Sequence, residues 1–248
     1  MLAHFMPWDF IFILLVLGVV VPWRGTARVK KLLDRPRLGT TDRLALYAST
    51  IAFQCTAAAV VAWRSLARGL TPRQLGLTLT DLPLAAGVTA ALSILLVAQQ
   101  IVGLRRMARK SAEHPSHLLR IALKLFPQTA VERLAFIALA ATVALCEEFL
   151  YRGFVFAAIR QAAGGSLAAA AIGSALLFSV AHLYQGRRGV ISTFVVGLIF
   201  AGTRIFTQSL APPIVVHLLV DLVAGLAAPR LLRNLHVYDV DSSSPAAG

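Results

Sequence analysis

Seven apolar runs follow one another along this chain of 248 residues, and they constrain its fold more than any other feature. They lie at residues 9–21, 43–63, 83–104, 131–161, 166–184, 189–206 and 210–228. An apolar helix of about 17 to 25 residues can cross a bilayer, where every backbone polar group must be satisfied inside the structure. The sequence therefore predicts an all-α fold, a polytopic transmembrane helix bundle of about seven to eight helices.

The composition agrees with this prediction and favours lipid over nucleic acid as the partner. Hydrophobic residues make up 58% of the chain and charged residues 14%, against roughly 25% charged residues in soluble domains. The 24 basic residues against 11 acids would also suit a nucleic-acid binder, but they fall in short segments between the apolar runs. Such segments are typical of cytoplasmic loops that face anionic lipid. We expect the lipid bilayer as a partner, no nucleic acid, and an N-terminus outside.

Two segments allow more than one interpretation. Residues 131–161 are too many for one perpendicular crossing, so they form either a tilted helix or an interfacial helix joined to a span. Residues 105–128 mix basic and apolar side chains, which fits either an amphipathic helix at the interface or a solvated loop. The polar tail after Tyr238 has the composition of a disordered segment.

Three acids lie well inside apolar runs and require an explanation. They are Glu147, Glu148 and Asp221. An ionisable group at the centre of a spanning helix costs about 2.5 to 3.5 kcal/mol on insertion scales, so it marks a functional candidate. Arg152 follows Glu148 by four residues and can pair with it on one helix face. Glu147 is rotated by about 100° from its neighbour, so it needs a partner on another helix.

Histidines occupy two later runs, 166–184 and 210–228, each in a pair of residues four positions apart. Phe178 and His182 are four residues apart, as are His217 and Asp221, so each pair shares a helix face. Each feature alone has an ordinary structural explanation, such as an interfacial histidine or a hydrogen-bonded pair. Together, acid or imidazole groups on three separate spans indicate one shared site.

In this order the motifs resemble those of a known family. EExxxR (Glu147, Glu148, Arg152), FxxxH (Phe178, His182) and HxxxN or HxxxD (His217, Asp221) are similar to the motifs of the CPBP family. That family comprises CAAX prenyl proteases and bacteriocin-processing endopeptidases, also called Abi. The resemblance divides the chain into N-terminal transmembrane helices with basic cytoplasmic loops (1–130), a CPBP-like catalytic core (131–228) and a C-terminal tail (229–248).

The resemblance implies an intramembrane endopeptidase of the glutamic or metallo type. Glu147 would be the general base and His182 would orient or share the proton. His217 and Asp221 would flank the oxyanion, with Glu148, Arg152 and Phe178 as supporting residues. At the position of Asp221 the family often has Asn, which can donate a hydrogen bond to an oxyanion. An ionised Asp221 only accepts hydrogen bonds, so orienting His217 is the more natural task for it. The substrate would be a membrane-associated or lipidated peptide or protein. The enzyme itself would be a multi-pass protein of the cell membrane, and the richness of the chain in Ala, Leu and Arg favours a bacterial inner membrane.

The sequence allows two alternatives for the cofactor, which are no cofactor or a Zn ion. Glu147, His182 and His217 match Zn ligands in kind and number, with a fourth position for water. The same residues also serve a metal-free glutamate mechanism, which we favour slightly.

Two other functions fit the same residues. A non-catalytic membrane scaffold or bacteriocin-immunity protein would keep the motifs for folding. A proton-coupled transporter would use the buried acids as a relay, but the chain lacks the paired broken helices of many such folds.

Geometry raises one difficulty for a shared site. In a simple seven-span layout, His182 and His217 lie about 15 Å apart in depth within a core of about 30 Å. A shared site then requires tilted helices with a connection that dips into the bundle, or another orientation of the later spans.

Overall fold

The computed structural model describes residues 6–35, 37–110 and 117–232, which are helices joined by turns, with no strand among them. The elements in chain order are α1 (Trp8–Leu15), the π-helical η1 (Val16–Val20), α2 (Val21–Leu33), α3 (Thr40–Ala67), α4 (Leu82–Lys110), α5 (His117–Leu125), α6 (Ala130–Glu147), the π-helical η2 (Glu148–Val155), α7 (Phe156–Ala162), α8 (Leu167–Ala181), the 3-10 turn η3 (Leu183–Gln185), α9 (Gly186–Thr207) and α10 (Ala211–Leu232). Because α1–α2 and α6–α7 each continue through their π-helical segment, the described residues form eight helices. The predicted all-α fold is confirmed.

The apolar helices make this a multi-pass membrane protein. Within the described residues, five helices are long and apolar enough to cross a membrane, and two shorter apolar helices accompany them. The five are Trp8–Leu33, Thr40–Ala67, Leu82–Arg106, Ala130–Ala162 and Leu183–Thr207. Many large apolar side chains point outward, among them Trp8, Trp63 and Ile94. An outer surface of this kind fits lipid, because hydrocarbon gives no reason to bury such side chains.

The first predicted span was too short, because the helix does not end at Val21. Pro22 lies in the first turn of α2, which directly follows the π-helical η1. The regular hydrogen-bond pattern of the α-helix is already interrupted there, so the proline does not end the helix. The helix then continues to Leu33 with Lys30 and Lys31 in its last turn, where cations suit the helix dipole. Lys124 of α5 also donates hydrogen bonds to the carbonyls of α2's final turn, including that of Leu32 at 3.2 Å.

The segment predicted at residues 105–128 is divided between two helices. α4 continues to Lys110, and residues 111–116 lie outside the described part. α5 buries Leu119 and Ile121 while Arg120 is exposed, which favours the amphipathic helix over the solvated loop. At the other end, α10 runs to Leu232, so the tail expected from residue 229 begins within a helix; the polar run after Tyr238 lies outside the described residues.

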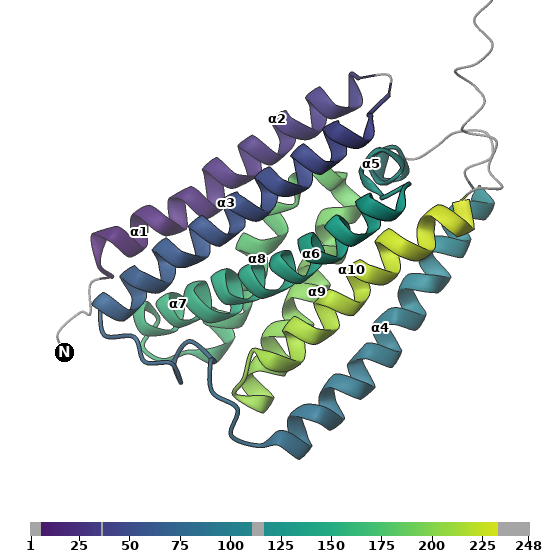
Figure 1. Cartoon of the computed structure of the whole chain (residues 1–248). Coiled ribbons are helices and arrows are strands. Elements are labelled where there is room, and N and C mark those ends of the chain that lie inside the picture. Colours follow the sequence, from purple (N-terminus) through teal and green to yellow (C-terminus); the bar gives the residue numbers. More distant parts are fainter. Residues whose placement is uncertain (1–5, 36, 111–116, 233–248) are drawn as a thin grey trace, which may run out of the picture.

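The helices form two layers, and the helix that contains the fourth predicted run, 131–161, lies among them (Figure 1). α4 packs along α10, α10 against α6, and α6 against α3. α8 and α9 pair behind them, and α7 packs on α8. Helices from both ends of the chain therefore surround α6 and η2.

α6, η2 and α7 form one helix from Ala130 to Ala162. Its 33 residues correspond to about 50 Å at 1.5 Å per residue, which exceeds a core of about 30 Å. The segment is one continuous helix, as the first of the two interpretations requires, and its length implies a tilt in a bilayer. All eight residues of η2 are buried. Because π-helical segments occur often at functional sites, η2 directs attention to Glu148 and Arg152.

An ion-pair cluster fastens α1 to the end of α3. Asp9 Oδ2 lies 2.6 Å from Arg64 Nη2 and 3.1 Å from Arg68 Nε, and Asp9 is buried. We expect Asp9→Ala to lower the free energy of unfolding by about 1.5 to 3 kcal/mol, because charged hydrogen bonds are lost. Thermal unfolding in detergent measures this, with Asp34→Ala as an exposed control. Equal melting temperatures for the two variants would contradict the expectation.

Candidate active site

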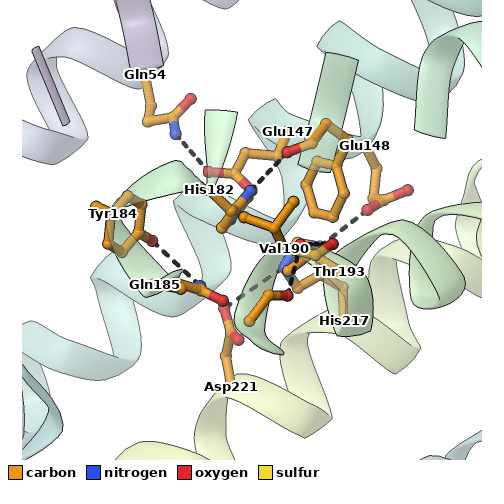
Figure 2. A network of polar contacts seen from close by, with 12 residues as sticks. Gln54, Glu147, Glu148, His182, Tyr184, Gln185, Val190, Thr193, His217 and Asp221 are labelled. Atoms are coloured by element: carbon orange, nitrogen blue, oxygen red, sulfur yellow. Dashed lines mark hydrogen bonds and ion pairs between the residues drawn. The ribbon is translucent and has the colours of Figure 1, made fainter. Parts of the chain in front are cut away.

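Glu147, at the end of α6, contacts side chains from two other helices (Figure 2). Its Oε1 accepts a hydrogen bond of 2.9 Å from Gln54 Nε2 on α3. Its Oε2 faces His182 Nε2 at 4.0 Å. The prediction that Glu147 finds its partner on another helix is confirmed by these contacts. Oε2 is buried and forms no hydrogen bond with the described residues.

His182, directly after α8, is held in a defined tautomer when neutral. Its Nδ1 lies 2.8 Å from the carbonyl oxygen of Phe178. Because a carbonyl only accepts, Nδ1 carries the proton and Nε2 presents its lone pair toward Glu147. The 4.0 Å between Nε2 and Oε2 is too long for a direct hydrogen bond but suits one bridging water.

A second polar cluster lies next to this pair and is more deeply buried. Glu148 Oε1 accepts from Arg152 Nη1 at 3.0 Å, and both side chains are 0% exposed. The same oxygen accepts from His217 Nδ1 at 2.9 Å. The guanidinium of Arg152 also lies over the ring of Phe178 at 4.0 Å. The Glu148–Arg152 pair was predicted, whereas the Glu148–His217 bond was missed, because it joins residues 69 positions apart.

Asp221 has a looser contact with His217 than expected. Its Oδ2 lies 3.7 Å from His217 Nε2, beyond hydrogen-bond distance, and its side chain is 33% exposed. The hydrogen bond that orients His217 comes from Glu148 instead. Glu148 and Asp221 therefore face different nitrogens of His217, and the orienting role expected of Asp221 stays a prediction.

Phe178 joins the two histidines. Its ring centroid lies 4.5 Å from that of His182 and 6.2 Å from that of His217. The expected separation of about 15 Å in depth is therefore wrong. α8 has only 15 residues, or about 22 Å, so its end does not reach the opposite face of a core of about 30 Å. The chain then turns through η3 and Gly186 (φ 77°) directly into α9.

The expected zinc ligands do not form a metal site in this arrangement. Among residues 6–35, 37–110 and 117–232, no three His, Cys, Asp or Glu side chains are grouped so that they could hold a metal ion. Glu147 and His182 face each other, but His217 directs Nδ1 to Glu148 and Nε2 toward Asp221. Zinc needs three such protein ligands around one point, so the three residues do not fit it here.

Gln54 was not singled out from the sequence, although a polar amide inside the apolar run 43–63 was a usable signal. We expect Gln54→Met to lower kcat for the predicted peptide cleavage about tenfold with KM unchanged, because Glu147 loses one positioning hydrogen bond. Gln99→Met, an exposed amide on α4, is the control. Cleavage kinetics on the purified protein measure both, and equal kcat values would contradict a positioning role for Gln54.

The protein is therefore a multi-pass membrane protein that holds a cluster of carboxylate and imidazole groups inside its helix bundle. Residues 129–223 match a protein family described as type II CAAX prenyl endopeptidase Rce1-like. The match covers less than half of the chain and contains all three motifs, and it confirms the family that the motifs predict. Residues 129–223 are thus similar to the CAAX prenyl endopeptidases of this family. Comparisons with curated proteins and with solved structures each returned no match.

Proposed function

We propose that this chain is an intramembrane peptidase that hydrolyses peptide bonds of membrane-associated or lipidated polypeptides in a bacterial cell membrane. The family match supports the reaction class. The observation that carries the proposal is the approach of Glu147 Oε2 to His182 Nε2 at 4.0 Å inside the bundle. Two groups that both accept hydrogen bonds can hold one water between them and leave its oxygen directed at a substrate.

In the proposed reaction this water attacks the carbonyl carbon of the peptide bond. Glu147 takes one proton of the water through Oε2, and the new carbon–oxygen bond turns the carbonyl oxygen into an oxyanion. His182 holds the water through Nε2, while its own Nδ1–H stays bonded to Phe178. The hydrogen bond from Gln54 keeps the carboxylate of Glu147 in place.

His217 is the proposed partner of the oxyanion. As an imidazolium it donates Nδ1–H to Glu148, and its Nε2–H, which lies 3.7 Å from Asp221 without a hydrogen bond, would donate to the oxyanion, while both carboxylates offset its charge. The carbon–nitrogen bond then breaks, and Glu147 returns its proton to the leaving amine. One water is consumed, and a carboxylic acid and an amine are released. No step is routed through a metal.

The proposal is tested by comparing membrane peptides from cells that carry the wild type or Glu147→Ala. We expect peptides that disappear with the substitution while the protein itself is still produced and inserted. An unchanged peptide profile with unchanged cellular function would favour the scaffold, and pH-dependent solute uptake lost in Glu147→Ala would favour the transporter. Either result would overturn the proposal.

A further inference from the structure

A basic pocket lies beside the candidate active site, between the end of α2 and α5. It has a volume of about 320 Å³, and its charged lining residues are Lys30, Asp34, His117 and Arg120. Tyr184 of η3 also lines it. None of the roles proposed for the peptidase reaction uses this pocket.

Hydrogen bonds between separate elements hold the walls of this pocket in place. Its wall α5 is fastened to α2, because Lys124 donates to the carbonyl of Leu33 at 3.1 Å. His117 Nε2–H donates to the carbonyl of Tyr184 at 3.0 Å. α2 also packs close to Tyr184 at Gly25, where a Cβ would lie 3.5 Å from Tyr184 Cδ1, at van der Waals contact. Three elements distant in sequence are thus held around one cavity.

The charge of the pocket favours an anion. Lys30 and Arg120 are exposed, and neither forms an ion pair with a residue in the described part of the chain. Of the charged side chains that line the pocket, the two cations outnumber the one carboxylate, Asp34. Two cations without carboxylate partners on facing helices are suited to a phosphate.

The position of the pocket indicates where this phosphate comes from. Val29 and Leu33 of α2 add apolar lining, and α2 continues directly from the apolar α1, whose exposed Trp8 and Phe12 fit lipid. A phospholipid beside α2 can therefore place its headgroup among the basic residues while its chains stay along the helix. Basic pockets between membrane helices commonly bind headgroups in this way.

We propose that this pocket binds the phosphate of an anionic phospholipid headgroup through Lys30 and Arg120. Asp34 can accept hydrogen bonds from headgroup hydroxyls, so phosphatidylglycerol is the suited probe. Because Tyr184 lines the pocket and its ring lies 5.7 Å from that of His182, the bound lipid would also support the turn that follows α8. The proposal concerns binding and does not depend on peptidase activity.

The test measures retention of phosphatidylglycerol on the full chain by native mass spectrometry, after release from nanodiscs of mixed phosphatidylglycerol and phosphatidylcholine. We expect Lys30→Gln/Arg120→Gln to weaken retention at least about tenfold, at about 1 kcal/mol per basic residue. The matched control is Lys31→Gln/Arg37→Gln, which removes the same charge from exposed positions outside the pocket. It should bind like the wild type.

Two results would overturn the proposal. Equal weakening in both double variants would show that lipid responds to the overall basic surface. Displacement of the lipid by millimolar glycerol 3-phosphate, with equal retention of phosphatidylcholine, would show a site for free phosphate compounds. Circular dichroism and melting temperatures of both variants confirm that they are folded before binding is compared.

Discussion

Glu147→Gln is expected to lower kcat for peptide cleavage by about 10²- to 10⁴-fold, the usual contribution of a general base. An amide cannot take the proton of the attacking water, but it has the same size and still accepts the hydrogen bond from Gln54. The protein should therefore fold and insert normally. Cleavage of a reporter peptide by the purified variant in lipid measures the effect.

Asp81→Asn is the matched control for this experiment. Asp81 is an exposed carboxylate in the turn before α4 and accepts from the backbone N–H of Leu84, which an asparagine can also do. Its activity should equal that of the wild type. Cleavage by Glu147→Gln at more than about half of the wild-type rate would remove Glu147 from the role of base.

Arg152→Met is expected to lower the free energy of unfolding by about 3 to 5 kcal/mol, the largest stability effect we predict. Glu148 and Arg152 are both fully buried, so removal of the guanidinium takes the permanent cation away from a buried carboxylate and leaves it with His217 as its hydrogen-bond partner. The double variant Glu148→Gln/Arg152→Met removes that charge as well and should recover part of the loss. Denaturant unfolding in micelles measures the series.

Arg188→Met provides the control for Arg152, since Arg188 is exposed in the first turns of α9. Its stability should stay close to that of the wild type. An Arg152→Met protein as stable as the control would mean that the buried pair contributes nothing to the fold. A double variant less stable than the single one would contradict the explanation by an uncompensated charge.

The helices could be predicted because the bilayer imposes a length and a polarity that the sequence displays directly. Residues 43–63 and 83–104 lie within α3 and α4. The end of the first helix was missed because Pro22 resembles a helix stop unless the π-helical η1 before it is known. Local composition does not contain that information.

The contacts of the candidate site could be predicted only where they are local. Glu148 and Arg152 pair at helical spacing, as do the rings of Phe178 and His182. The bonds from Gln54 to Glu147 and from His217 to Glu148 join residues 93 and 69 positions apart. Such pairs depend on which helices become neighbours, and one sequence alone does not specify this.

The most direct test of the account is an experimental structure of the wild-type protein in lipid, at a resolution that shows ordered solvent, with anomalous data for zinc. We predict one water within about 3.2 Å of both Glu147 Oε2 and His182 Nε2, with no anomalous signal at that position. Side chains too far apart to contact a common water, or a zinc ion between them, would contradict it.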